Sequence, residues 1–233
     1  MIADKLHQVH ARIARACAQA GRAVESVTLL SVSKTFGPEA VREAVAAGER
    51  RFGENYVQEG VDKIAQLSDL RERIEWHLIG PLQSNKTRVV AEQFDWVHSV
   101  DRLKIAQRLS EQRPAHLPPL QLCLQVNISF EPSKRGLRPA DVADVAHAVA
   151  ALPRVTLRGL MAIPEPAADF DAQRAPYRAL RELMRTLQAG GLALDTLSIG
   201  MSADLEAAVA EGATLVRIGS AVFGTRPPIS TQA

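Results

Sequence analysis

The segment VTLLSVSKTFGPEAVREAVAAGERRFGEN (27–55) predicts a strand, a helix and a second strand in close succession. The apolar run at 27–33 is typical of a buried strand. The helix expected over 38–47 follows a Gly-Pro pair and ends at Gly48, and a second strand is expected at 50–55. Strands separated by a helix pair in parallel through a right-handed crossover, so this segment forms one β/α unit.

The same alternation continues to the end of the chain. Further strands are expected at 74–80, 94–100, 120–129, 155–163, 194–200 and 214–220. Further helices are expected at 55–67, 84–92, 102–113, 139–151, 176–189 and 203–211, and an extra helix at 3–20 precedes the first strand. Eight parallel strand–helix units favour a closed barrel over an open sheet. The sequence therefore predicts an α/β fold, a single (β/α)8 TIM barrel with an extra N-terminal helix, in one domain over residues 1–233.

Length and composition agree with one soluble barrel domain. The chain has 233 residues, of which 46% are hydrophobic and 23% charged. The 28 basic and 26 acidic residues nearly balance, which argues against a nucleic-acid or acidic-membrane partner. The N-terminal sequence does not resemble a signal peptide and no 18-residue apolar run occurs, so we expect a cytoplasmic protein without a membrane span. Cys17 and Cys123 are expected to be buried thiols rather than a disulfide framework.

Polar residues gather at the carboxyl ends of the expected strands, where barrels build their active sites. Lys34 directly follows an apolar strand, which should place its amine over the barrel mouth. Ser202 follows the seventh strand, and Gly219 and Ser220 follow the eighth, where barrels commonly bind phosphate. A lysine amine in a partly desolvated site can form an imine. A lysine beside a phosphate cradle therefore indicates a phosphorylated aldehyde, and pyridoxal 5'-phosphate (PLP) supplies both groups.

Nine stretches of the chain together carry a family resemblance. They are SVSKT (31–35), FGENYVQE (52–59), WHLIGPLQSNK (76–86), HSVD (98–101), VNIS (126–129), KRG (134–136), GLMAI (159–163), LSIGMSAD (197–204) and VRIGSAVFG (216–224). In combination they resemble the YggS/PROSC family of pyridoxal phosphate homeostasis proteins, whose members are similar to the barrel domain of alanine racemase without its second domain. The resemblance implies a fold-type III PLP barrel that buffers or delivers PLP.

The resemblance also implies roles for individual residues. Lys34 would hold PLP as a Schiff base, and Arg217 would point at the pyridine nitrogen. Ser202, Gly219 and Ser220 would hold the phosphate.

The resemblance implies that three further residues surround the bound ring. Asn55 would lie at its edge, His77 beside or behind it, and Met201 near the phosphate end. Lys86 and Lys134 lie on loops at the mouth, and each is either a solvated charge or a transient contact for PLP.

Two classes of function remain open. The first is a PLP carrier that serves PLP-dependent apoenzymes, and the second is a PLP enzyme such as an amino-acid racemase. Racemisation needs a second base, which in the racemase-type arrangement is a tyrosine of the second domain. Here Tyr177 lies in an apolar helical stripe and Tyr56 on the barrel itself, so the sequence favours a carrier without enzymatic activity. A sugar-phosphate enzyme is disfavoured because Lys34 lies on the first strand, and without the racemase's second domain we expect a monomer.

Overall fold

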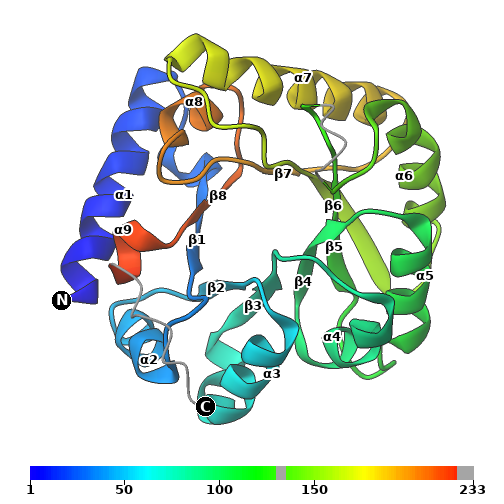
Figure 1. Ribbon diagram of the computed structural model, residues 1–233, viewed down its shortest axis with the longest axis horizontal. Helices are drawn as coiled ribbons and strands as arrows, with labels where there is room; N and C mark the ends of the chain where they lie inside the picture. Colours follow the sequence, from blue (N-terminus) through cyan, green and yellow to red (C-terminus); the bar gives the residue numbers. More distant parts are fainter. Residues whose placement is uncertain (130–134, 225–233) are drawn as a thin grey trace, which may run out of the picture.

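The computed structural model describes residues 1–129 and 135–224. Within these residues, eight strands pair in chain order, each parallel to the next, and the eighth pairs with the first to close a barrel (Figure 1). The strands are β1 (Thr28–Val32), β2 (Arg51–Glu54), β3 (Glu75–Leu78), β4 (Trp96–Val100), β5 (Leu120–Gln125), β6 (Val155–Met161), β7 (Thr196–Ser198) and β8 (Leu215–Ile218). The predicted α/β barrel is confirmed, and each expected strand is present.

The helices surround the barrel on its outer side (Figure 1). Helix α1 (Ile2–Gln19) precedes the first strand and packs against α8 and α9. The other α-helices are α2 (Pro38–Ala46), α3 (Val57–Gln66), α4 (Thr87–Gln93), α5 (Leu103–Gln112), α6 (Val142–Ala150), α7 (Phe170–Ala189), α8 (Leu205–Ala210) and α9 (Ser220–Phe223). Short 3₁₀ helices lie in connections: η1 (Val24–Ser26), η2 (Ser68–Arg73), η3 (Ser84–Lys86) and η4 (Pro139–Asp141).

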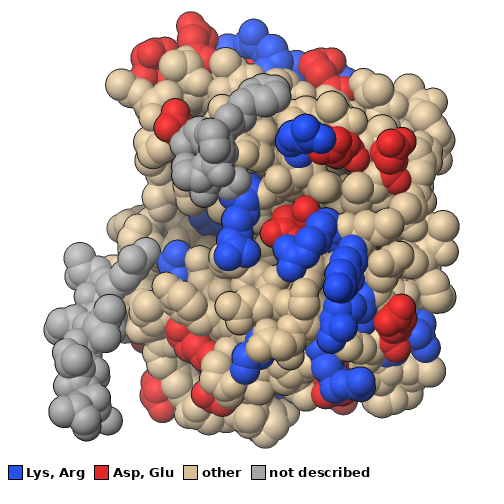
Figure 2. All heavy atoms as spheres, turned by 45° about the vertical axis from the view of Figure 1, so that its right-hand side comes forward, with Lys and Arg blue, Asp and Glu red and all other residues tan. Residues whose placement is uncertain are grey.

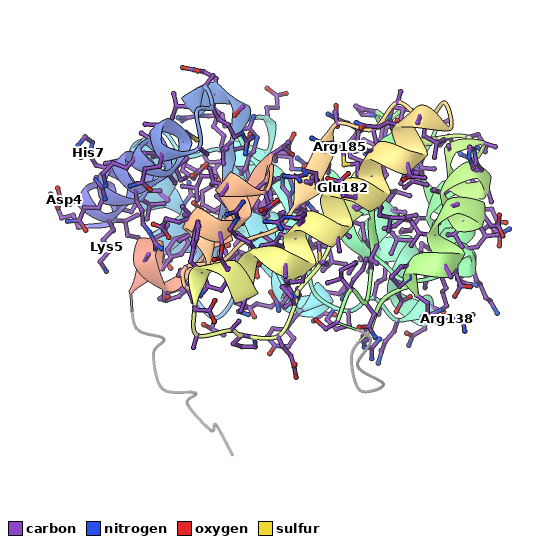
Figure 3. The ribbon with its side chains drawn as sticks, turned by 90° about the horizontal axis from the view of Figure 1, so that it is seen from above. Asp4, Lys5, His7, Arg138, Glu182 and Arg185 are labelled. Atoms are coloured by element: carbon purple, nitrogen blue, oxygen red, sulfur yellow. The ribbon has the colours of Figure 1, made fainter. Side chains whose placement is uncertain are left out.

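Helix α1 shows how the sequence orients the helices. Leu6, Val9 and Ile13 recur at three- and four-residue spacing, and all three are buried against the rest of the protein. Figure 3 shows Asp4 and His7 on the opposite side of the helix, directed away from the barrel. The apolar stripe therefore decides which side of this helix faces the core.

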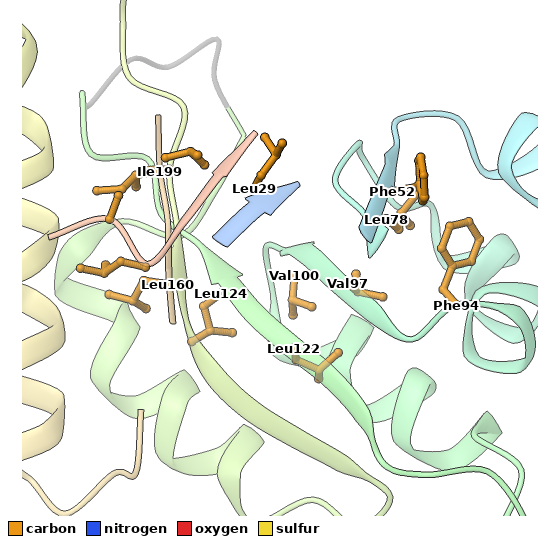
Figure 4. Close-up of a cluster of buried hydrophobic side chains, with 14 of the residues drawn as sticks. Leu29, Phe52, Leu78, Phe94, Val97, Val100, Leu122, Leu124, Leu160 and Ile199 are labelled. Carbon is orange, nitrogen blue, oxygen red and sulfur yellow. The ribbon is translucent and has the colours of Figure 1, made fainter. Parts of the chain in front are cut away.

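The main core lies between the strands and the surrounding helices. Phe52, Leu78, Val97 and Leu122 come from four consecutive strands and are fully buried in it (Figure 4). Because side chains alternate along a strand, the residues between them point into the barrel. Burial of both faces explains why the strands appear in the sequence as nearly continuous apolar runs.

The predicted start of one helix is wrong. Helix α7 begins at Phe170 rather than at residue 176. The Asp169 carboxylate caps it by accepting a hydrogen bond from the backbone N–H of Ala172 at 2.8 Å. Pro176 lies inside the helix and removes one backbone hydrogen bond, but the buried residues that follow it, beginning with Tyr177, hold the helix against the barrel.

The structure also bears on two expectations about the cysteines and about membrane-spanning helices. Cys17 and Cys123 are both buried and unbonded, as predicted. None of the helices within 1–129 and 135–224 combines the length and the apolar character needed to cross a bilayer.

Candidate functional site

A cavity of about 330 Å³ opens at the carboxyl ends of the strands, on the side where β8 closes onto β1. Its size suits a small organic ligand. Figure 2 shows a hollow in the molecular surface with lysine and arginine side chains gathered beside it. The lining residues are Val32, Lys34, Phe36, Asn55, Ile79, Ile163, Met201, Ser202, Ala203, Arg217, Gly219, Ser220 and Gly224. Seven of the eight site residues expected from the sequence are in this set, and the exception is His77.

The structure places His77 inside the barrel, away from this cavity. Its ring is fully buried, with Nδ1 2.8 Å from His98 Nε2 and Nε2 2.9 Å from the Glu75 carboxylate. Residues two apart on a strand share a face, so the next inward-facing residue after His77 is Ile79, which lines the cavity. The expectation that His77 lies beside or behind the ligand ring is corrected in one respect: His77 does not line the cavity and lies one layer deeper in the barrel.

Lys34 lies between two residues whose positions are tightly constrained. Ser33 donates its hydroxyl hydrogen to the Glu54 carboxylate at 2.6 Å, and Thr35 donates its backbone N–H to the Glu59 carboxylate at 2.5 Å. Thr35 has a φ of 69°, a left-handed conformation that costs a β-branched residue about 1–3 kcal/mol. Strain of this kind persists where the surroundings enforce it, and here it accompanies the turn that directs Lys34 to the cavity.

Lys63 of α3 links these contacts into one cluster. Its ammonium donates to the Glu54 carboxylate at 2.6 Å, to the Ser33 carbonyl at 2.9 Å and to the Glu59 carboxylate at 3.2 Å. The Lys63 and Glu54 side chains are 4% and 0% exposed. Burial raises the pKa of Glu54, and the charge and hydrogen bond of Lys63 oppose that rise. This cluster, here named the Lys63 clamp (Ser33, Glu54, Glu59 and Lys63), holds the backbone on both sides of Lys34, and no sequence pattern pointed to it.

Arg217 of β8 is buried at the floor of the cavity. It donates through Nη1 to the Ser198 carbonyl at 2.5 Å and hydroxyl at 2.8 Å, and through Nη2 to the Ala162 carbonyl at 3.0 Å. A guanidinium has five N–H groups, so these three bonds leave two N–H groups for a ligand. Burial lowers the pKa of Arg217, but an arginine remains a charged donor at neutral pH.

The loop after β7 is shaped by a glycine and an aspartate. Gly200 has a φ of 92°, and a Cβ at this position would lie 2.5 Å from the Ala208 Cβ. The Asp204 carboxylate accepts the Met201 backbone N–H at 2.7 Å and the Tyr177 hydroxyl at 2.6 Å. These bonds hold the loop that presents Met201 and the next residue, Ser202, to the cavity. Tyr177 is buried, as the sequence predicted, and burial raises the pKa of its hydroxyl.

Part of the cavity wall is apolar and was not predicted. Phe36, Ile79 and Ile163 each lie just beyond the end of a strand and line the cavity. For Ile79 and Ile163 the signal in the sequence was the inward–outward alternation of the strand, continued by one or two residues past its end, whereas Phe36 lies in the turn after β1 and had no such signal. An apolar wall facing a charged floor suits a ligand with a planar ring and polar substituents.

The sequence left open whether Lys86 and Lys134 contact the ligand. Lys86 ends η3 and is not among the residues that line the cavity. Lys134 lies outside the described residues.

A larger hollow of about 610 Å³ lies at the opposite end of the barrel, where the strands begin. Several arginines line it, but Arg51 pairs with Glu75 at 3.3 Å and Arg71 pairs with Asp95 at 2.7 Å. Acidic residues of the protein thus neutralise much of its charge. Its described lining contains no lysine that could form an imine, so the smaller cavity is the candidate site.

The polar groups that the smaller cavity offers to a ligand define which ligand would fit. The Asn55 amide has a buried Oδ1 without a hydrogen-bond partner among the described residues, and Arg217 has two N–H groups to donate. Ser202 and Ser220 add hydroxyl groups at one side of the cavity. A pyridine ring that carries a hydroxyl, a phosphate and an aldehyde would satisfy these groups and meet the Lys34 amine, so the donor set fits PLP.

Comparison with known sequences agrees with this chemistry. The family model of the alanine racemase N-terminal domain matches residues 6–227. A Pseudomonas aeruginosa protein named pyridoxal phosphate homeostasis protein is 61% identical over 225 residues, which cover 97% of this chain and 96% of the relative. The protein of the same name from Escherichia coli K12 is 54% identical over 226 residues, which cover 97% of each chain.

Solved structures show the same relationship. PipY of Synechococcus elongatus PCC7942, solved with PLP bound, superposes with a TM-score of 0.84 at 40% identity and covers 96% of this chain and 100% of its own. Alanine racemase from Corynebacterium glutamicum, at 17% identity and a TM-score of 0.69, covers 98% of this chain and 62% of the racemase, and shares the fold. The chain therefore belongs to the family of pyridoxal phosphate homeostasis proteins, which is built on the barrel of the alanine racemase N-terminal domain.

Proposed function

We propose that this protein binds PLP as a Schiff base on Lys34 and serves PLP homeostasis by buffering the cofactor and delivering it to apoenzymes. The proposal depends on one observation: a lysine, a buried arginine with unused N–H groups and two serines line the same cavity. The relatives support it, since PipY has been solved with PLP bound and the curated relatives at 46–61% identity are named homeostasis proteins.

Five of the residues that line the cavity have a role in this proposal. Lys34 would hold the cofactor through an imine between its amine and the aldehyde, a bond whose formation releases one water and which hydrolysis reverses. Ser202, Gly219 and Ser220 bind the phosphate through hydroxyl and backbone N–H groups. Arg217 would donate a hydrogen bond to the ring nitrogen. When bound, PLP supplies an aldehyde that forms imines and a ring that can accept electrons.

The arrangement of the cavity favours a carrier over an enzyme. A guanidinium donates a hydrogen bond to the ring nitrogen but keeps its proton, which leaves the ring a weak electron acceptor. Tyr177 is buried and donates its hydroxyl to Asp204, and Tyr56 is 60% exposed. Neither tyrosine is among the described residues that line the cavity, so no phenol is placed there as a second base for racemisation. The curated relatives are named for homeostasis and not for a reaction.

Borohydride trapping of the purified protein tests the proposal. Reduction of the C=N bond should attach PLP irreversibly to the peptide that contains Lys34, as read by peptide mass spectrometry. Lys34→Ala should remove the trapped product, whereas Lys86→Ala is the matched control because Lys86 does not line the cavity. If the wild-type protein traps no PLP after incubation with the cofactor, the proposal is wrong.

Two activity measurements separate carrier from enzyme. Mixing the loaded protein with a PLP-dependent apoenzyme should restore that enzyme's activity, with loss of the visible PLP absorption from the donor. Conversion of L-amino acids to their D-forms by the loaded protein, abolished in Lys34→Ala, would instead establish the racemase alternative.

A further inference from the structure

A chain of hydrogen bonds crosses the interior of the barrel from one end to the other. Arg217 Nη1 lies 2.8 Å from Ser198 Oγ, which lies 2.8 Å from His98 Nδ1. His98 Nε2 lies 2.8 Å from His77 Nδ1, and His77 Nε2 lies 2.9 Å from the Glu75 carboxylate. We name these five side chains the histidine chain. They come from strands β8, β7, β4 and β3.

The two ends of the histidine chain fix its direction. Arginine can only donate and an ionised carboxylate can only accept. Ser198 accepts from Arg217, so its single hydrogen is available for His98 Nδ1, and His98 then donates from Nε2 to His77 Nδ1. His77 in turn donates from Nε2 to Glu75. The reverse order would point an imidazole lone pair at the Glu75 carboxylate, which is unfavourable.

Burial supports the neutral form of both imidazoles. Both rings are fully buried, and desolvation lowers the pKa of His77 and lowers that of His98 further. His77 also stacks on Trp96 with ring centroids 5.3 Å apart and planes within 12°, which holds its orientation. Two neutral rings, each with its hydrogen on Nε2, complete every donor–acceptor pair of the histidine chain.

The two ends of the histidine chain reach different hollows. Arg217 lines the cavity proposed for PLP, whereas Glu75 is 39% exposed and lines the larger hollow at the other end of the barrel. Glu75 there also pairs with Arg51 at 3.3 Å. A change in the acceptor at Glu75 can therefore alter the hydrogen bonding of Arg217 through the three side chains between them.

We infer that the histidine chain orients the Arg217 guanidinium toward the cofactor cavity and makes ligand binding there depend on the acceptor at Glu75. His77, His98 and Ser198 are thus positioning residues, and the inference rests on the proposed function for its effect on PLP. The Ser198 hydroxyl and carbonyl both take hydrogens of Nη1, which fixes the guanidinium plane and leaves its two unused N–H groups for a ligand.

Histidine tautomers test the direction without any cofactor. In protein labelled with ¹⁵N-histidine, two-dimensional NMR at about pH 7 should show both buried rings as neutral Nε2–H tautomers. In Ser198→Ala, His98 Nδ1 loses its donor and the His98 signals should shift toward a tautomer mixture. Ser31→Ala is the matched control, because Ser31 is equally buried and bonds Glu49 outside the histidine chain. A cationic ring, or an Nδ1–H tautomer in the wild-type protein, would overturn the inference.

Measuring PLP affinity after substitution of Glu75 tests whether this end of the histidine chain affects binding at Arg217. Glu75→Ala removes the final acceptor and should weaken PLP binding roughly three- to tenfold, the range expected when one ordinary hydrogen bond is lost. Glu75→Gln keeps an acceptor oxygen and should bind within about twofold of the wild type. Both variants lose the ion pair with Arg51, so that pair does not contribute to the difference between them.

The outcomes of the two experiments are distinguishable. If the wild-type protein does not bind PLP, the proposed function fails while the tautomer result stands. If it binds PLP and Glu75→Ala, Glu75→Gln and Ser198→Ala all match the wild-type affinity, the positioning role is refuted and the proposed function stands.

Discussion

Substitution of Lys63 by methionine should strongly destabilise the protein and loosen the backbone turn that contains Lys34. The substitution keeps most of the side-chain volume but removes the cation that contacts Glu54 at 2.6 Å. Because the Glu54 side chain is 0% exposed, its carboxylate would remain buried without a counter-charge. Breaking a buried pair on one side costs about 3–5 kcal/mol, which is a large share of the roughly 5–15 kcal/mol that stabilises a domain.

The pH dependence of this variant has a definite sign. Burial already raises the pKa of Glu54 above its ordinary value of 4.5, and removal of Lys63 takes away the charge that opposes the rise. A carboxyl group with a raised folded-state pKa contributes stability below its unfolded pKa and loses it as pH increases. The stability deficit of Lys63→Met relative to wild type should therefore be smaller at about pH 5 than at about pH 8.

Urea denaturation measures both effects through the midpoint and slope of unfolding. The control is Lys104→Met, an exposed lysine on α5, which should change stability by no more than about 0.5 kcal/mol. The double variant Lys63→Met/Glu54→Gln removes both charges and keeps an acceptor for Ser33, so it should recover part of the loss. A loss below about 1 kcal/mol for Lys63→Met, or a double variant no more stable than the single one, would refute the reasoning.

Three further predictions concern the loop after β7 and a buried cysteine. Gly200→Ala should cost about 1–3 kcal/mol, because the added Cβ meets Ala208 and the backbone is left-handed; an unchanged melting midpoint would contradict this. Asp204→Ala should weaken PLP binding roughly tenfold in a fluorescence titration, because the carboxylate holds the loop that reaches the cavity, and an equal Kd would count against it. Burial raises the pKa of the Cys123 thiol to about 12, so a thiol reagent at about pH 8 should label it only after unfolding; immediate labelling of the native protein would exclude that burial.

The barrel could be predicted because its signals are local. The run at 27–33 and the helix entry at 38 are decided by neighbours within a few residues, and parallel pairing follows from the alternation itself. Position at a strand end was enough to bring Lys34 and Arg217 to one cavity, because all carboxyl ends of a closed parallel barrel meet at the same mouth. The early start of α7 escaped prediction, because tertiary packing of the residues after Pro176 outweighs the local cost of the proline.

The depth of each side chain within the barrel was decided by the tertiary structure. His77 belongs to the expected strand, but the strand bounds place it a layer below the cavity, in contact with His98. The bond between Lys63 and Glu54 joins residues 9 positions apart and the bond between His98 and Ser198 joins residues 100 positions apart, and strand register and helix packing set such distances. The sequence by itself determined which strands form and which ends carry polar groups, because these depend on local periodicity. Which buried polar groups become partners was settled only by closure of the barrel, since a hydrogen bond requires atoms within about 3 Å and no sequence pattern specifies that separation.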